Sequence, residues 1–321
     1  MGSFSYFHLR LQFSLIFALL FISTGVSGAR FTFVNKCDFT VWPGILGSPK
    51  LSSSGFQLTK GSSRSFEAPT GWSGRFWGRT GCNFDVSSRG SCATADCGSG
   101  QVECDGASAA PPATLAEFTL GSGSKDFYDV SLVDGYNLPI IVQASGGSGG
   151  CESTGCSLDL NRNCPAELRV EGGSACRSAC DAFKNPEYCC SGAYASPSTC
   201  KPSTYSQLFK SACPTSYSYA YDDATSTFTC TGADYTITFC RNMPSLKSSS
   251  DSPPQATGTG ISNDTDSDTG AQEGSVEQAT LAASWLASLA TGDSARTHPF
   301  WWVVQCAFVL ATSLILCYIN S

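Results

Sequence analysis

The chain has 321 residues, 18 cysteines and a formal net charge of −7. So many cysteines in a chain of this length indicate an oxidising compartment, where disulfides persist. Residues 30–244 carry 16 basic and 19 acidic side chains, which excludes a nucleic-acid binder that would need a basic stripe.

Residues 1–28 have the pattern of a secretory signal peptide. Arg10 precedes an apolar run, Leu11–Ile22, and small residues follow up to Gly28. This order predicts cleavage between Gly28 and Ala29. The apolar run is shorter than a membrane-spanning helix requires.

Four strands are predicted in the first part of the globular domain, which we place at residues 29–244. The first of the four is rich in alternating aromatic and β-branched residues. The four strands are Phe31–Val34, Thr40–Trp42, Ser62–Phe66 and Gly74–Thr80, with Trp42-Pro43-Gly44 ending the second.

Three carboxylates, Glu117, Asp129 and Asp134, lie close together in the next stretch of sequence. Thr114–Leu120 is a predicted strand in which Phe118 faces the apolar side, so Glu117 points to the opposite side. These carboxylates are the candidate groups for acid–base chemistry or ligand binding.

A second strand, Asp126–Val133, contains Asp129. The dipeptide Asp134-Gly135 follows it and predicts a hairpin turn into a return strand that ends near Ala144.

Cys151–Cys213 holds nine of the sixteen cysteines of the predicted domain. Two short helices are predicted here, over Ala175–Lys184 and Thr204–Ala212, because Asn185-Pro186 and Pro214 end them. The segment is interpreted as a loop-rich subdomain held by disulfides. A final strand is predicted where Tyr235, Ile237 and Phe239 alternate. The many short strands together favour a mainly β fold, an antiparallel sandwich or barrel.

The only histidines, His8 and His298, lie in segments predicted to be removed. A mature chain without histidine cannot form a Ser-His-Asp triad or a histidine-ligated zinc site. We therefore expect no metal and no cofactor, and any catalysis would depend on carboxylates.

The C-terminal part is interpreted as an extended linker, or stalk, followed by a signal for membrane anchoring. Residues 245–292 form a Ser/Thr/Pro/Asp-rich linker with a glycosylation sequon at Asn263. Residues 293–321 resemble a GPI-anchor signal, with attachment near Gly292 or Asp293, because Phe300–Ile319 is apolar and no basic residue follows it. A single-pass transmembrane helix is the alternative.

Several motifs resemble those of the thaumatin-like, pathogenesis-related plant proteins across residues 29–241. All sixteen domain cysteines fall in the family order. The motifs are Phe31–Cys37, Trp77–Cys82, Cys92–Cys97, Pro111–Phe118, Tyr188–Cys190 and Ser226–Cys230.

The resemblance implies an antiparallel β-sandwich core with a disulfide-rich lobe of loops and short helices, a small loop lobe and eight disulfides. The implied pairs are Cys37–Cys240, Cys82–Cys92, Cys97–Cys104, Cys151–Cys230, Cys156–Cys213, Cys164–Cys176, Cys180–Cys189 and Cys190–Cys200.

The resemblance also implies an acidic cleft. Carried over by motif, its residues are Arg75, Glu117, Asp129, Asp134 and Asp222, with Asp223 as the alternative to the last.

The resemblance further implies β-1,3-glucan as the ligand. Two carboxylates suffice for glycoside hydrolysis, and the candidates are Glu117 as acid with Asp134 or Asp129 as partner. Binding without appreciable turnover is the favoured hypothesis, in a monomeric, antifungal defence protein held at the outer face of the plasma membrane. The alternative is a non-catalytic surface module that binds wall polysaccharide, callose or a protein.

Overall fold

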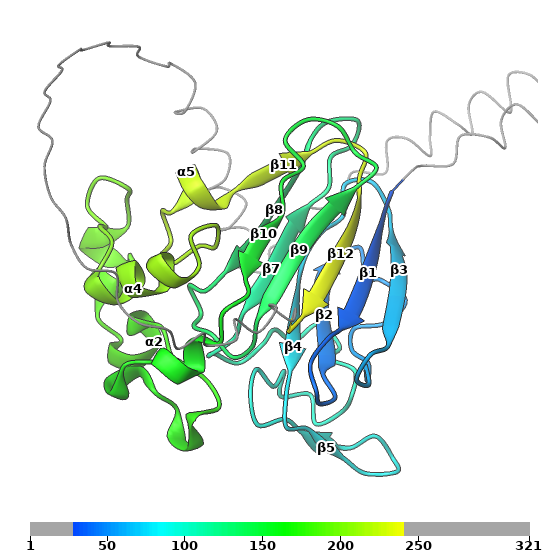
Figure 1. The fold of residues 1–321 in the computed structure, drawn as a ribbon, viewed down its shortest axis with the longest axis horizontal. Helices are drawn as coiled ribbons and strands as arrows, with labels where there is room; N and C mark the ends of the chain where they lie inside the picture. The colour runs from blue at the N-terminus through cyan, green and yellow to red at the C-terminus, as the bar shows by residue number, and fades with distance from the viewer. Residues whose placement is uncertain (1–27, 241–321) are drawn as a thin grey trace, which may run out of the picture. The chain divides into compact units, whose positions relative to one another are not determined.

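A computed structural model describes residues 28–240. Its core is two five-stranded β-sheets that form two layers (Figure 1). The first sheet has the order β10 (Thr154–Cys156), β9 (Ile140–Ser145), β12 (Asp234–Phe239), β1 (Ala29–Asn35) and β3 (Ser63–Ala68). The second has the order β11 (Phe228–Cys230), β8 (Asp126–Ser131), β7 (Leu115–Thr119), β4 (Ser73–Arg79) and β2 (Trp42–Ser48).

Neighbouring strands in these two sheets are antiparallel except for β1 and β12, which are parallel. The first and last strands of the described fold therefore lie side by side. The disulfide Cys37–Cys240 joins the chain just beyond both strands. The architecture confirms the predicted mainly β, antiparallel sandwich.

Aromatic side chains fill the space between the sheets. Phe31 and Phe33 of β1 are fully buried, as are Phe76 of β4 and Phe118 of β7. The ring centroids of Phe31 and Phe118 are 4.8 Å apart, and those of Phe33 and Phe76 are 5.0 Å apart. The period-2 alternation that predicted these strands thus marks their core-facing residues.

The prediction that Trp42-Pro43-Gly44 ends a strand is wrong, because β2 begins at Trp42 and continues to Ser48. Proline has no backbone N–H to donate. The strand β2 tolerates Pro43 because it lies at the edge of its sheet and pairs on one side only.

The predicted hairpin at Asp134-Gly135 is also wrong. A turn forms there, with Gly135 at φ +91° and its N–H donating to the Leu132 carbonyl. However, β8 lies in the second sheet and β9 in the first. The turn residues predicted a change of direction but not the crossing between sheets.

The disulfide-rich lobe contains short helices, several of which Figure 1 shows beside the sandwich. They are α2 (Ala179–Phe183), α3 (Pro186–Cys189), α4 (Thr204–Ala212) and α5 (Asp223–Ser226), with the 3-10 turns η1 (Leu160–Asn163), η2 (Ala166–Leu168), η3 (Glu171–Gly173) and η4 (Gly192–Tyr194).

The α4 helix has the predicted bounds, whereas α2 starts four residues later than the predicted helix. The Ser178 side chain accepts a hydrogen bond from the Asp181 N–H and so caps α2 at its start. Asn185 then caps α3, with Pro186 at its first position, so the dipeptide that ends one helix also begins the next.

The small loop lobe spans residues 80–113 and contains the two short strands β5 (Asn83–Phe84) and β6 (Gly90–Ser91). Trp77 and Leu115, on the outer face of the second sheet, pack against Cys97 and Cys104 of this lobe.

Residues 28–240 contain eight disulfides, and they join the same pairs that the resemblance implies. Among residues 28–240, no helix has the length and apolar character needed to cross a bilayer. Three predicted segments lie outside the described residues: the signal peptide, except for its last residue Gly28, the linker 245–292 with Asn263, and the anchor signal 293–321 with its attachment site near Gly292 or Asp293.

Candidate functional site

Three ionisable side chains form a row across the outer face of the second sheet. Arg75 of β4 pairs with Glu117 of β7, and Glu117 pairs with Asp129 of β8. Directly opposite residues on neighbouring strands share a face, so the three side chains are neighbours. We call Arg75, Glu117 and Asp129 the charged row.

The alternation of the strands explains why these residues face away from the core. The residue that follows each member of the charged row is fully buried in the core between the sheets; these residues are Phe76, Phe118 and Val130. The prediction that Glu117 lies opposite the apolar face of its strand agrees with this placement.

The charged row is well shielded from solvent. Arg75 Nε lies 3.4 Å from Glu117 Oε1, and the two side chains are only 12% and 4% exposed. Asp129 is fully buried, and neither of its carboxylate oxygens accepts a hydrogen bond within residues 28–240. These groups are therefore not ordinary solvated surface charges.

This shielding changes the proton affinity of the carboxyl groups. Burial raises the pKa of Glu117, the Arg75 charge opposes that increase, and the charge of Asp134 adds to it. Burial raises the pKa of Asp129 well above its usual value, and the neighbouring Glu117 charge raises it further.

Asp134 belongs to the same site although it lies on a turn beyond β8. Burial raises its pKa, Arg75 opposes the increase, and Asp181 of α2 adds to it. The Arg75 charge thus acts on Glu117, Asp129 and Asp134 alike. The structure brings these four predicted residues together.

The two candidate aspartates at the start of α5 differ in their surroundings. Asp222 accepts hydrogen bonds from the Ser218 N–H and hydroxyl, both at 2.9 Å, and pairs with Lys210 Nζ at 3.0 Å. Asp223 accepts a hydrogen bond from the Tyr217 hydroxyl at 2.9 Å, and its charge raises the pKa of Asp129. Asp222 is therefore engaged by hydrogen bonds and an ion pair within the lobe, whereas the charge of Asp223 acts on Asp129.

Tyr217 is a residue of this site that the sequence analysis missed. Its N–H donates to the Val130 carbonyl and its carbonyl accepts from the Leu132 N–H, both at 2.9 Å, so the lobe is hydrogen-bonded to the end of β8. Burial and then the Asp129 charge raise the pKa of its hydroxyl. This pairing links distant parts of the chain, and no local motif indicates it.

The arrangement offers both hydrogen-bond donors and acceptors. Carboxyl groups with raised pKa values can donate when protonated and accept when ionised, and the Arg75 guanidinium only donates. Such groups suit a neutral ligand with many hydroxyls. No cluster of His, Cys, Asp or Glu within residues 28–240 is arranged to hold a metal ion.

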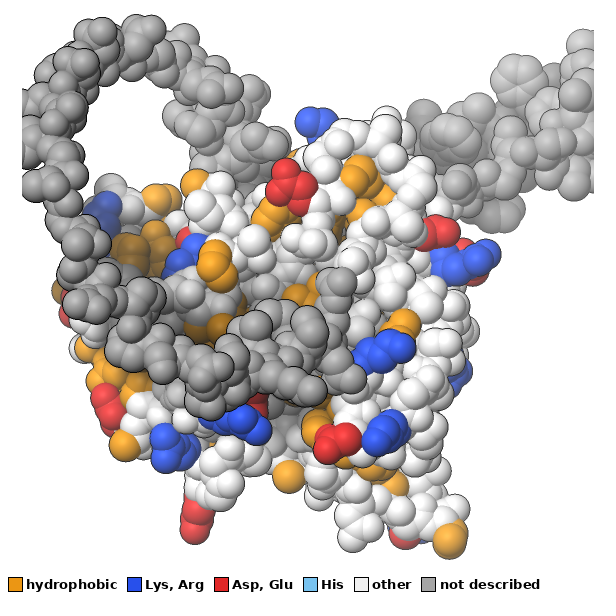
Figure 2. All heavy atoms as spheres, in the orientation of Figure 1, with side chains coloured by type: hydrophobic (Ala, Val, Ile, Leu, Met, Phe, Trp, Pro, Cys, Tyr) orange, Lys and Arg blue, Asp and Glu red, His pale blue; other side chains and the backbone are white. Residues whose placement is uncertain are grey.

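The visible part of one face of the molecule carries dispersed charges (Figure 2). On the face in Figure 2, single acidic and basic side chains lie among uncharged ones and form no continuous basic stripe.

A two-layer β-sandwich with a disulfide-rich lobe and buried carboxyl groups on one sheet defines a class of disulfide-stabilised β proteins. The sequence profile described as the Thaumatin family matches residues 35–241. This chain belongs to that family.

Curated relatives cover most of the chain. Thaumatin-like protein 1 of Arabidopsis thaliana is 63% identical over 251 residues, which span 75% of this chain and 96% of the relative. Pathogenesis-related protein 5 of the same plant is 56% identical, over 70% of this chain and 96% of the relative. A glucan endo-1,3-beta-glucosidase of Prunus avium is 51% identical, over 67% and 92%.

Proposed function

We propose that this thaumatin-like defence protein binds β-1,3-glucan at the charged row together with Asp134. The observation that carries the proposal is the grouping of Glu117, Asp129 and Asp134 around one guanidinium, that of Arg75. A neutral polysaccharide offers hydroxyls to such groups without adding charge to a shielded site. The name of the Prunus avium relative supports glucan as the ligand.

Hydrolysis of the bound glucan is the second candidate activity, and the raised pKa of Glu117 favours it. Glycoside hydrolysis requires a protonated carboxyl group and an ionised one on opposite sides of the scissile bond. Glu117 would supply the proton and Asp134 would be the ionised partner. Asp129, whose pKa is raised well above its usual value, suits a neutral hydrogen-bond donor rather than a base.

Glu117→Gln and Asp134→Asn test both activities, because each replacement keeps the shape of the side chain and removes the ionisable group. Sedimentation with insoluble β-1,3-glucan should show about tenfold weaker binding for each variant. If the wild type cleaves glucan, Glu117→Gln should abolish turnover while retaining part of the binding.

Glu67→Gln is the matched control, because Glu67 pairs with Arg30 on the exposed side of the first sheet and its side chain is 70% exposed. Wild-type protein that neither binds nor cleaves glucan would contradict the proposal. A protein partner would then be the leading alternative, recognisable by binding that weakens steeply with salt.

We also propose that the protein acts at the cell surface. Thaumatin-like pathogenesis-related proteins are generally extracellular, and the eight disulfides fit an oxidising compartment. The apolar stretch Phe300–Ile319, preceded by small residues around Gly292 and by a polar spacer, supports a GPI anchor on the outer leaflet of the plasma membrane.

Phosphatidylinositol-specific phospholipase C should release the protein from membranes if this anchor is present. Retention on the membrane together with survival of a tag placed after Ser321 would indicate a transmembrane helix instead.

A further inference from the structure

A hollow of about 200 Å³ lies beside the edge strand β2, outside the charged row. Its walls come from the end of β2, the segment 50–54 and the loop 103–106. This volume equals that of several water molecules, so it can hold one sugar ring.

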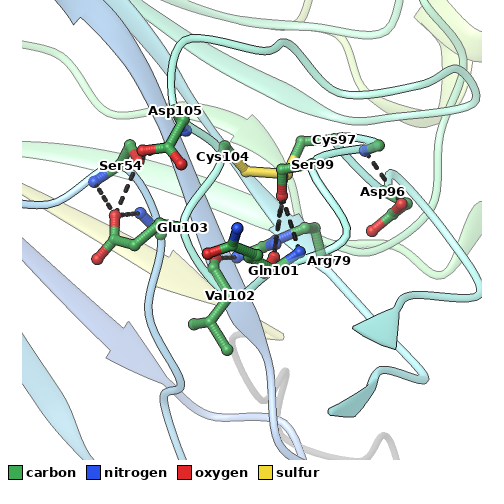
Figure 3. Close-up of a disulfide and its surroundings, with 12 residues drawn as sticks. Ser54, Arg79, Asp96, Cys97, Ser99, Gln101, Val102, Glu103, Cys104 and Asp105 are labelled. Carbon is green, nitrogen blue, oxygen red and sulfur yellow. Dashed lines mark hydrogen bonds between the residues drawn. A yellow bond between two sulfur atoms is a disulfide. The ribbon is translucent and has the colours of Figure 1, made fainter. Parts of the chain in front are cut away.

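The wall of the hollow is held in place by a carboxylate (Figure 3). Glu103 accepts hydrogen bonds from the Ser53 hydroxyl, the Ser54 N–H and hydroxyl, and the Gly55 N–H. Burial alone would raise the pKa of Glu103, but these hydrogen bonds outweigh it, so its pKa lies below the usual value. We call this contact the Glu103 clasp.

A buried arginine, Arg79, also holds the loop that carries Glu103. Arg79 is fully buried, and its guanidinium donates to the carbonyls of Trp42 at 3.0 Å and Val102 at 2.6 Å. The disulfide Cys97–Cys104 closes the loop next to Glu103. The walls are thus fixed before any ligand arrives, which lowers the entropic cost of binding.

Three polar side chains in the hollow remain available. Within residues 28–240, no hydrogen bond or ion pair engages the side chains of Lys50, Ser52 or Asp105. Leu46 and Leu51 add apolar surface beside them. Apolar surface with a few donors and acceptors is the composition of a small-ligand site, and it suits a sugar, whose ring has apolar faces and a hydroxyl rim.

The hollow also lies in line with the charged row. Leu46 of β2 pairs directly with Arg75, so Leu46, Arg75, Glu117 and Asp129 follow one another across four strands. Adjacent strands are about 4.8 Å apart, so this line is about 14 Å long, the length of a short oligosaccharide.

We propose that the hollow beside β2 is a subsite for a further glucose residue of a β-glucan chain whose other residues contact the charged row. This inference rests on the proposed glucan binding. Lys50 and Asp105 would hydrogen-bond to the sugar hydroxyls, while Leu46 and Leu51 would pack against its ring.

The test is calorimetric binding of β-1,3-linked glucose oligomers, from the dimer to the hexamer, to the full mature protein. Lys50→Met and Asp105→Asn remove the charges and keep the side-chain lengths, and asparagine tolerates the left-handed backbone of Asp105, at φ +49°. Lys60→Met and Asp38→Asn are matched controls, because both residues are exposed and lie outside the hollow.

The wild type should bind long oligomers more tightly than short ones. Lys50→Met and Asp105→Asn should each weaken hexamer binding about tenfold, leave dimer binding unchanged, and differ from their controls. Equal hexamer affinity in variants and controls would overturn the subsite while leaving glucan binding at the charged row intact. If the wild type binds no oligomer of any length, the proposed function fails and the subsite fails with it.

Discussion

Asp129 is a fully buried carboxyl group next to a second carboxyl group, Glu117, and its pKa is raised mainly by burial. The folded protein therefore holds this proton more tightly than the unfolded chain does. Its contribution to stability is complete below the unfolded pKa, about 3.9 for aspartate, and is lost as the pH rises through the higher folded pKa.

Asp129→Asn should remove that loss. At neutral pH the variant should have a higher unfolding temperature and a larger free energy of unfolding than the wild type, and both differences should vanish near pH 4. Thermal unfolding followed by circular dichroism across that pH range measures them. Asp38→Asn, on an exposed loop, serves as the control and should show no such pH-dependent difference. A destabilised Asp129→Asn variant at neutral pH would contradict this account.

At the scale of elements, the Glu103 clasp connects the small loop lobe to the segment that runs beside β2. Glu103→Ala leaves the backbone N–H groups of Ser54 and Gly55 without their acceptor. We expect a loss of about 2–3 kcal/mol, or about 5–10 °C in unfolding temperature.

The control for Glu103→Ala is Glu67→Ala, which breaks an exposed ion pair and should cost less than about 1 kcal/mol. Because the pKa of Glu103 is lowered, its contribution is present above the unfolded pKa of glutamate and is lost on acidification. An effect of Glu103→Ala no larger than that of the control would show that the clasp is not stabilising.

Local patterns predicted the elements better than their connections. Both ends of the α4 helix were predicted correctly, and Pro214 follows its last residue closely. The hairpin at Asp134-Gly135 was wrong because a turn dipeptide carries no information about which sheet the next strand joins. Which strands pair, and in which sheet, depends on contacts between distant residues.

The same limit applies to the candidate site. Alternation placed Glu117 on the outer side of its strand, but the alignment with Arg75 and Asp129 depends on the register of three strands. The choice between Asp222 and Asp223 depends on Lys210 and Tyr217, which no pattern connects to them. The family resemblance supplied the grouping of residues that local patterns could not.

At the scale of the whole molecule, Cys37–Cys240 closes a loop with a sequence separation of 203 residues, whereas Cys180–Cys189 closes one of 9. On the chain-entropy model the first stabilises the fold by about 5 kcal/mol and the second by about 2.5 kcal/mol. Replacing both cysteines of a pair by serine should therefore lower the unfolding temperature more for Cys37–Cys240.

Thermal unfolding of the two double variants, each compared with the wild type, measures this difference. Equal losses would mean that the constraint on the unfolded chain is not the main contribution of the longer loop.

The parallel pairing of β1 and β12 has a mechanical consequence. A pull on the chain beyond residue 240 acts along β12, which is hydrogen-bonded to β9 on one side and to β1 on the other. Those hydrogen bonds run across the strand, so the load shears many of them at once instead of opening them one by one. The Cys37–Cys240 bond also passes part of the load to the chain next to β1. If the protein is anchored at its C-terminal side and binds a polymer, the folded domain would therefore resist unfolding when force is applied between the two.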